Sequence, residues 1–301
     1  MSKEKRIKNP YSIFRTIIQL GFFFLFYMLA FNSITPYIKA SIIPITVPVL
    51  ISLRSHLSSM AGSLTFIQYM LSLPLFPWIP LASILVIGII IGRLLCGWAC
   101  PFGFIQDLLS RLSKEKIRIS QQNHNKYIKI KFVFLGITLF VSFILALSLH
   151  LDANNELKRA LGPFAEGIFY TISPNETFFG DLPRLLAQIS TGSLNLNISN
   201  YLLYFNLIFL IFILIGAFKI PRFWCRYLCP LGGFLGLIAK CSLLGIRRDL
   251  TKCDRCTKCV KVCPMQIKIL ELPWEKFTDT ECTLCVECIE ECPNDALKLK
   301  I

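Results

Sequence analysis

The chain has 301 residues, of which 54% are hydrophobic and 17% are charged, and its mean hydropathy is +0.59. This composition is too apolar for an ordinary soluble domain and is typical of a membrane protein. The formal net charge is +14, but no basic helix or aromatic-basic groove is visible, so we expect no nucleic acid partner. The thirteen cysteines do not indicate a disulfide scaffold, because eight of them lie within the last fifty residues at metal-ligand spacing.

A helix needs about 20 apolar residues to cross a bilayer. Four windows qualify, and they run from Thr16 to Ile34, Leu75 to Leu95, Phe132 to Leu151 and Leu202 to Phe218. The first window follows a basic stretch without a convincing cleavage site, so we expect an uncleaved anchor. Two prolines interrupt the apolar stretch from Ile42 to Leu73, which favours an interfacial or re-entrant segment over a fifth crossing.

The basic residues are unevenly distributed along the chain. Of the 32 Lys and Arg residues, 27 lie around the start of the first window, between Arg93 and Lys131, or after Phe218. The positive-inside rule then predicts a multi-pass protein of a prokaryotic cytoplasmic (inner) membrane with both termini in the cytoplasm and membrane lipid as a partner. Phe102 to Ile119 has the pattern of an amphipathic helix, which lies along the inner surface or packs on the C-terminal domain.

Two cysteine runs near the C-terminus repeat one pattern, Cys-x-x-Cys-x-x-Cys-x-x-x-Cys-Pro. The cysteines are Cys253, Cys256, Cys259 and Cys263 in the first run and Cys282, Cys285, Cys288 and Cys292 in the second. This pattern predicts two 4Fe-4S clusters, and in the bacterial two-cluster arrangement the last Cys of each run binds the other cluster. One cluster is then held by Cys253, Cys256, Cys259 and Cys292, and the other by Cys282, Cys285, Cys288 and Cys263. Structural zinc is a poor alternative, because two cysteine pairs would leave the third close cysteine unexplained.

The expected fold class is therefore a mainly α membrane protein with a small C-terminal α+β two-cluster ferredoxin domain. Residues 1–245 are predicted to form a four-helix transmembrane domain, and residues 246–301 the ferredoxin domain. The ferredoxin domain has few core residues, so we expect its folding to depend on bound clusters.

A second cysteine pattern occurs twice, 129 residues apart. Arg93-x-x-Cys96-x-x-x-Cys100-Pro follows the second window, and Arg222-x-x-Cys225-x-x-x-Cys229-Pro follows the fourth. The repetition predicts that the four crossings are a duplicated helix pair, with each Cys-Pro loop on the cytoplasmic side. Proline favours the first position of a helix, so Cys100 and Cys229 are expected at helix N-termini near an arginine, where the pKa of a thiol falls.

These four cysteines are candidate redox or partner thiols, or a third metal or cluster site. The alternative is that they are small buried hydrophobes, with Arg93 and Arg222 extending to the lipid headgroups. Cys241 matches neither pattern and is expected to be a packed core thiol.

Together these motifs resemble the NapH-like membrane polyferredoxins, the 4Fe-4S ferredoxin-type membrane components of quinol dehydrogenases. The resemblance covers most of the chain. It implies electron transfer between the quinone pool and a redox partner such as a reductase subunit, a cytochrome or another ferredoxin, with the eight C-terminal cysteines as cluster ligands. We expect an electron-transfer component of an oxidoreductase, with no catalytic residue assigned.

Two other functions remain open at this stage. A metal-ion (copper) reductase of the oxidase-assembly type shares a Cys-x-x-x-Cys-Pro membrane motif with two clusters. A redox-sensing membrane regulator would use the clusters as sensors and would not turn over any quinol.

Overall fold

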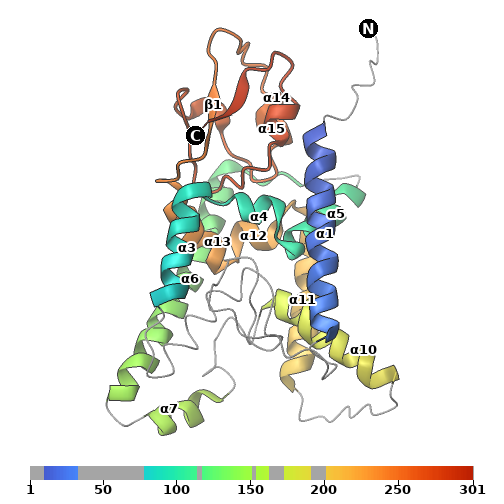
Figure 1. Ribbon diagram of the computed structural model, residues 1–301, viewed down its shortest axis with the longest axis vertical. Coiled ribbons are helices and arrows are strands. Elements are labelled where there is room, and N and C mark those ends of the chain that lie inside the picture. The colour runs from blue at the N-terminus through green and yellow to red at the C-terminus, as the bar shows by residue number, and fades with distance from the viewer. Residues whose placement is uncertain are drawn as a thin grey trace.

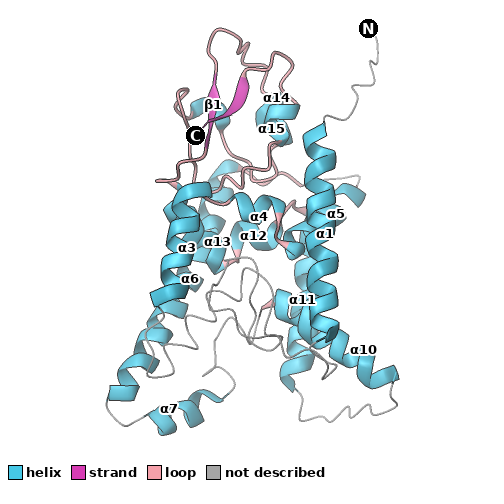
Figure 2. Cartoon of the chain, in the orientation of Figure 1, coloured by secondary structure: helices cyan, strands magenta, loops and turns pink. Residues whose placement is uncertain are grey.

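The computed structural model describes residues 10–32, 78–113, 117–150, 154–162, 173–190 and 201–300. Helices dominate, and the strands lie in the C-terminal domain (Figures 1 and 2). The longer helices are α1 (Pro10–Asn32), α3 (Trp78–Ile91), α5 (Pro101–Leu112), α6 (Gln121–His150), α7 (Asn154–Leu161), α10 (Leu182–Ser190), α11 (Tyr201–Lys219) and α13 (Pro230–Ala239). The short elements are α4 (Leu94–Trp98), α9 (Pro174–Glu176), a π-helix (Thr177–Asp181), α12 (Phe223–Tyr227), β1 (Gly245–Arg248), α14 (Lys258–Val262), a 3-10 helix (Ile269–Glu271), α15 (Glu287–Glu290) and β2 (Leu297–Lys300).

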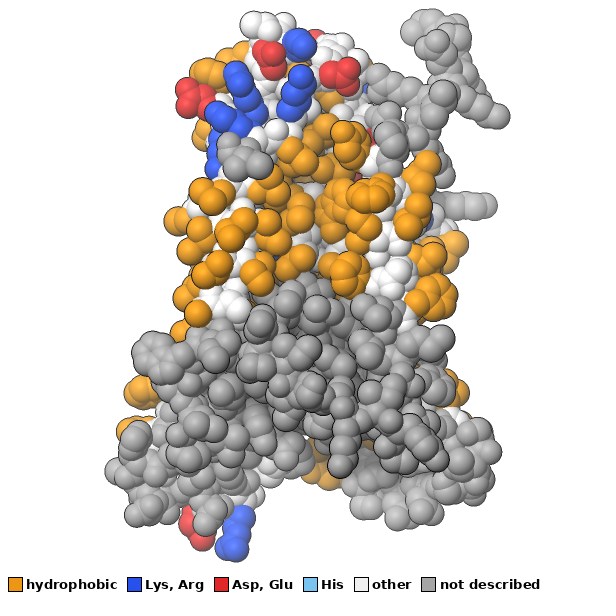
Figure 3. Space-filling view, viewed as in Figure 1, with side chains coloured by type: hydrophobic (Ala, Val, Ile, Leu, Met, Phe, Trp, Pro, Cys, Tyr) orange, Lys and Arg blue, Asp and Glu red, His pale blue; other side chains and the backbone are white. Residues whose placement is uncertain are grey.

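Four helices, α1, α3, α6 and α11, coincide with the four predicted windows. Within the described part of the chain, two helices are long and apolar enough to cross a membrane, Gln121–Ile144 and Tyr201–Lys219. Shorter apolar stretches occupy α1 and α3. Hydrophobic side chains cover these helices below the C-terminal domain on the face shown in Figure 3. The segment from Ile42 to Leu73 lies outside the described residues.

Each Cys-Pro loop folds into a short helix, a break and a second helix. Cys100 is the N-cap of α5 and Cys229 is the N-cap of α13, and a proline opens each helix. The two thiols accept hydrogen bonds from the backbone N–H of Gly103 and Gly232, respectively. The predicted helix N-termini are confirmed, and the sequence repeat corresponds to a repeat in local structure.

The helix predicted after the first Cys-Pro loop is α5. It packs on α1 and α11, and its buried residues include the polar Gln106, Asp107 and Ser110. Leu108 and Leu112 are exposed instead. Phe102 is also buried and Arg111 is exposed beside the leucines, so the outer face of α5 is amphipathic, as the sequence predicts.

The C-terminal domain forms one end of the molecule, shown orange to red in Figure 1. Strands β1 and β2 pair in antiparallel register, from Gly245 opposite Lys300 to Arg248 opposite Leu297. The pairing joins the beginning of the domain to its end. Its buried core is small and consists of Ile246, Cys259, Met265, Ile267, Ile269, Phe277, Leu284, Cys288 and Leu297.

A buried group of charges joins α1, α5 and the loop after α11. Arg222 binds Asp107 through two hydrogen bonds, Nε to Oδ1 at 2.8 Å and Nη2 to Oδ2 at 2.7 Å. Arg15 of α1 binds the same carboxylate at 2.8 Å. Burial alone would raise the pKa of Asp107, but the two guanidinium groups outweigh burial and hold this pKa at about 2. Asp107 is therefore ionised at neutral pH.

We predict that Asp107→Ala destabilises the protein by about 3 to 5 kcal/mol, because it leaves two buried guanidinium groups without their shared partner. Thermal unfolding in detergent would measure the loss. The matched control is Glu156→Ala, which removes an ion pair to Arg159 whose side chains are both more than 80% exposed and should leave the melting temperature nearly unchanged. Equal melting temperatures for the two variants would contradict the role of Asp107.

Candidate metal centres

The first C-terminal cavity is surrounded by Cys253, Cys256, Cys259 and Cys292 and has a volume of about 20 Å³. Three of these cysteines come from the first run and one from the second. The thiol of Cys292 accepts a hydrogen bond from the backbone N–H of Ala296 at 3.3 Å. The fold thus brings together the four residues that the sequence predicts for one cluster.

The second C-terminal cavity has a volume of about 20 Å³, and its lining contains Cys263, Cys282, Cys285 and Cys288. Here the single cysteine comes from the first run. In each cavity, therefore, three cysteines come from one run and the last cysteine comes from the other, which is the grouping that the two-cluster arrangement predicts for the ligands.

The backbone of each run is bent to point its thiols inward. Arg255 and Thr257 in the first run, and Leu284 and Val286 in the second, all have positive φ angles, between 48° and 62°. Such angles are uncommon outside glycine and are unusual for a β-branched residue such as Val286. The same two positions are affected in both runs, so the distortion belongs to the shared cysteine pattern.

The Cys-Pro loops surround a third cavity, of about 20 Å³, whose lining includes Cys96, Cys100, Cys225 and Cys229. It lies where α4, α5, α12 and α13 meet, at the boundary between the long helices and the C-terminal domain. Cys96, Cys100 and Cys225 are all less than a tenth exposed. The structure therefore gathers all four candidate thiols at one buried site.

Each Cys-Pro loop is linked to the other by a buried arginine. Arg93 donates from Nη2 to the carbonyl oxygen of Cys225 at 3.4 Å, and Arg222 donates from Nη1 to that of Cys96 at 3.5 Å. Both arginines are at most 1% exposed. The alternative that they extend to the lipid headgroups is wrong, because carboxylates inside the protein bind both, Glu281 for Arg93 and Asp107 for Arg222.

The pKa of the loop thiols moves in the opposite direction from the one expected. Burial raises the pKa of Cys100, Cys225 and Cys229, the last to about 12. Loss of hydration outweighs the nearby arginine and the helix N-terminus. These thiols become thiolates only where a metal compensates the buried charge.

The segment from Thr280 to Leu284, at the start of the second cysteine run, contacts the Cys-Pro loops directly. Arg93 donates to the carbonyl oxygen of Thr280 at 2.6 Å, and Arg222 donates to the hydroxyl of Thr283 at 3.0 Å. The indole N–H of Trp98 donates to the carbonyl oxygen of Leu284 at 2.9 Å. The second C-terminal cavity and the Cys-Pro cavity are therefore neighbours, separated by the contact between these two loops.

Two further charges hold the same segment. Lys131 of α6, fully buried, forms an ion pair with Glu281. Arg15 of α1 donates to the carbonyl oxygen of Cys285 and to the carboxylate of Glu287, both at 2.9 Å. Helices α1 and α6 thus both bind the loop of the second cysteine run.

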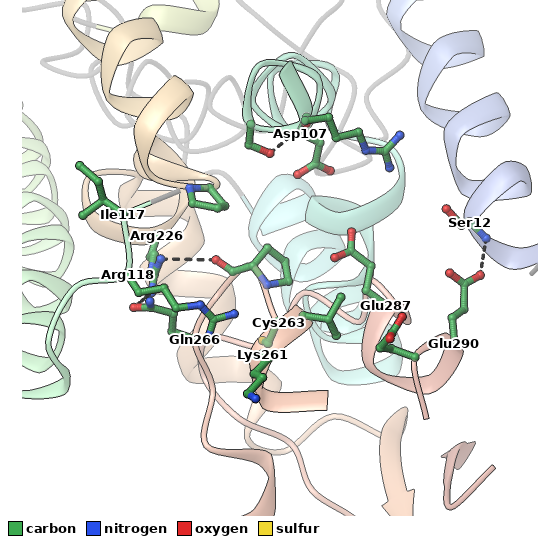
Figure 4. A pocket seen from close by; sticks show the side chains of 16 residues that line it. Ser12, Asp107, Ile117, Arg118, Arg226, Lys261, Cys263, Gln266, Glu287 and Glu290 are labelled. Atoms are coloured by element: carbon green, nitrogen blue, oxygen red, sulfur yellow. Dashed lines mark hydrogen bonds between the residues drawn. The ribbon is translucent and has the colours of Figure 1, made fainter. Parts of the chain in front are cut away.

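An open pocket separates the C-terminal domain from α1, α5 and α12, and Figure 4 shows the side chains that line it. Its wall includes Cys263, which also lines the second C-terminal cavity. Glu290 faces Ser12 of α1 across one edge, and Arg226 donates to the carbonyl oxygen of Pro264. A molecule in this pocket would approach the second cavity through Cys263.

Sequence reasoning missed several residues that build the site. Arg15, Gln106, Asp107, Lys131 and Glu281 are all buried, and each bonds to a Cys-Pro loop or to the second cysteine run. For Arg15 and Lys131, the available signal was a charged side chain directly before an apolar window, where its burial requires a partner.

The position of Cys241 also differs from the prediction. It lies on the surface just after the end of α13, and it lines none of the three cavities. The prediction of a packed core thiol is wrong, because the chain leaves α13 at this point and turns toward β1.

Comparison with known proteins places these segments among iron-sulfur proteins. Residues 73–120 and 202–251 match the family described as 4Fe-4S binding domain, and residues 245–293 match the 4Fe-4S dicluster domain. The first two matches contain the Cys-Pro loops, and the third contains most of the C-terminal domain. No solved structure matches the chain.

The curated relatives point the same way. An uncharacterized protein of Methanocaldococcus jannaschii is 30% identical over 197 residues, 64% of this chain and 66% of the relative. The putative electron transport protein YccM of Escherichia coli is 26% identical over 64% of this chain and 47% of its own length. The ferredoxin-type protein NapH of Haemophilus influenzae is 43% identical over 51 residues, 17% of either chain. The matched part thus spans two thirds or less of each relative.

We predict that Gly97→Ala loosens the contact between the Cys-Pro loop and the second cysteine run. A Cβ atom at this position would lie 2.2 Å from the carbonyl oxygen of Thr283, so the backbone must move. Hydrogen exchange of residues 280–285 should become faster. The matched control is Gly136→Ala in α6, where nothing lies within 4 Å of the added atom. Unchanged exchange in Gly97→Ala would argue against the tight docking described here.

Proposed function

Because the chain belongs to the family of NapH-like 4Fe-4S ferredoxin-type membrane proteins, we propose that it passes electrons between the membrane quinone pool and a redox partner. The observation that carries the proposal is the pair of C-terminal cavities, each lined by four cysteines taken three from one run and one from the other. The partner is another redox protein, such as a reductase subunit, a cytochrome or a ferredoxin.

The cysteine sets fit two 4Fe-4S clusters. Cys253, Cys256, Cys259 and Cys292 would hold one cluster, and Cys263, Cys282, Cys285 and Cys288 the other. Clusters of this kind are one-electron carriers whose potential depends on charge, burial and hydrogen bonds to sulfur. The chain supplies the inward-facing thiols, the N–H group of Ala296 on Cys292 and the arginines around Cys285.

We further propose that α1, α3, α6 and α11 cross the cytoplasmic membrane as a duplicated pair, with both termini on the cytoplasmic side. The exposed apolar surface of α6 and α11 supports this arrangement. So does the ion pair between Lys131 of α6 and Glu281, which ties the start of the apolar part of α6 to the C-terminal domain. Lys and Arg residues gather on the end of the molecule that would face the cytoplasm (Figure 3).

The open pocket beside Cys263 is our candidate for the approach of the quinone headgroup. In the proposed orientation it lies at the membrane surface, between the helices and the C-terminal domain (Figure 4). Arg111 and Arg118 could donate hydrogen bonds to quinone oxygens. Burial raises the pKa of Glu290 in the same wall, which suits this carboxylate to accept a proton from a quinol.

Electron transfer is favoured over a metal-ion reductase. A reductase of that type would need its metal substrate to reach the Cys-Pro thiols. Cys96, Cys100 and Cys225 are buried under α4, α5 and α12, and the open pocket leads to Cys263 instead.

The function can be tested with protein purified anaerobically and placed in lipid nanodiscs. A menaquinol or ubiquinol analogue should bleach the iron-sulfur absorbance near 400 nm, about the wavelength at which such clusters absorb. Glu290→Gln should slow the bleaching while iron content stays the same. The proposed link to the quinone pool is wrong if dithionite bleaches the protein but no quinol reduces the clusters and no quinone reoxidises them.

The ligand assignment can be tested separately. We predict that Cys292→Ala and Cys263→Ala remove different clusters, although each residue ends a run of the same pattern. Combining Cys292→Ala with Cys256→Ala should cost no more iron than Cys256→Ala alone, whereas combining it with Cys285→Ala should remove both clusters. Iron analysis and EPR of the reduced variants would measure this, and the reverse pairing would show that each run keeps its own last cysteine.

A further inference from the structure

The Cys-Pro cavity has the dimensions and donor set of the two C-terminal cavities. All three cavities have a volume of about 20 Å³, and each of the three is lined by four cysteines. No three His, Cys, Asp or Glu side chains anywhere in the described ranges converge on the position of a single ion. In all three places the thiols surround a space, as the ligands of a polynuclear cluster do.

The site is built by both halves of the sequence repeat. Each half gives one cysteine within a short helix, Cys96 or Cys225, and one at a helix N-cap, Cys100 or Cys229. Arg93 from the first half and Arg222 from the second make reciprocal contacts across the repeat. A central group held equally by both halves is the simplest reason for this arrangement.

Hydrogen-bond donors already point at the sulfur atoms. Backbone N–H groups lie 3.4 Å from Sγ of Cys100 and 3.3 Å from Sγ of Cys229, and the amide of Gln106 lies 3.2 Å from Sγ of Cys225. The contact of Ala296 with Cys292 in the C-terminal domain is of the same kind, at 3.3 Å. Donors of this kind stabilise the thiolate ligands of iron-sulfur clusters.

Three buried polar atoms at the cavity have no hydrogen-bond partner. They are Nε of Arg93, Nε1 of Trp224 and Oδ1 of Asn175, and all three residues line the cavity. Arg93 and Trp224 are at most 3% exposed and Asn175 is 4% exposed. Unsatisfied buried donors are costly and rare, and no residue in the described part of the chain supplies an acceptor for the two N–H groups.

We propose that Cys96, Cys100, Cys225 and Cys229 bind a third 4Fe-4S cluster, whose sulfide ions accept hydrogen bonds from Trp224 and Arg93. The buried arginines offset the negative charge of four thiolates and the cluster core. The proposal rests on the proposed electron-transfer function and extends it, because the contact of the Cys-Pro loop with Thr283 puts this site next to the second C-terminal cavity, on the side facing the membrane.

Iron and acid-labile sulfide analysis of the full-length protein, purified anaerobically, tests the proposal. The wild-type protein should contain about twelve irons per chain, as three cubane clusters require. Cys100→Ala combined with Cys229→Ala should contain about eight irons and keep the spectrum of the C-terminal clusters. Cys241→Ala changes an exposed cysteine outside all three cavities and should match the wild-type content.

Several results would overturn the third cluster. One is about eight irons in both the wild-type protein and the double variant; another is one zinc or copper ion per chain that disappears in the double variant. Failure of the proposed function has a different outcome. About four irons in the wild-type protein and none in the double variant would leave the third cluster in place and remove the two in the C-terminal domain.

A second variant avoids any dependence on the folding of the cysteine variants. Trp224→Phe keeps an aromatic ring in the cavity wall and removes only the N–H donor. Iron content should stay at the wild-type value, while the midpoint potential of one cluster becomes more negative, because a donor to sulfur stabilises the reduced state. Trp274→Phe is the matched control, because Trp274 is 43% exposed and lines none of the three cavities. Unchanged potentials in Trp224→Phe would contradict the placement of a cluster beside this indole.

Discussion

The structure depends on two buried arginines that occupy equivalent positions in a sequence repeat. Arg93 and Arg222 each lie three residues before a cysteine, cross to the opposite Cys-Pro loop, and also bind the segment from Thr280 to Thr283. A buried guanidinium group is costly unless it is fully paired. Glu281 and Asp107 pair with these arginines, so the two halves of the repeat and the C-terminal domain are held in one arrangement.

This constraint places the second C-terminal cavity next to the Cys-Pro cavity. The loop that carries Cys282 and Cys285 rests on the loop that carries Cys96, and the last cysteine of each C-terminal run lines the cavity of the other run. Electron transfer is favoured by short, rigid separations between carriers, and buried ion pairs to Glu281 hold these two sites together. The open pocket is lined by Cys263 and so gives access to the second C-terminal cavity from outside.

Much of this could be predicted from the sequence, because cysteine spacing and hydrophobic length are local signals. The four helices and the N-cap positions of Cys100 and Cys229 followed from such signals. The raised pKa of the Cys229 thiol could not be predicted in this way, because local sequence shows the arginine and the helix N-terminus but not the burial that outweighs both. The roles of Asp107 and Glu281 could not be predicted either, since their partners come from segments far away in the chain. Cys241 was predicted to lie in the core because it fits neither cysteine pattern. That reasoning carries no information about where α13 ends, and the end of α13 is what puts Cys241 on the surface.

The most direct test of this account is anomalous diffraction at the iron absorption edge, collected from crystals of the anaerobically purified protein. The account predicts three separate iron peaks: two in the C-terminal domain and one enclosed by Cys96, Cys100, Cys225 and Cys229, beneath the segment held by Arg93 and Arg222. Iron density confined to the C-terminal domain, with the four Cys-Pro thiols packed together and free of metal, would contradict it.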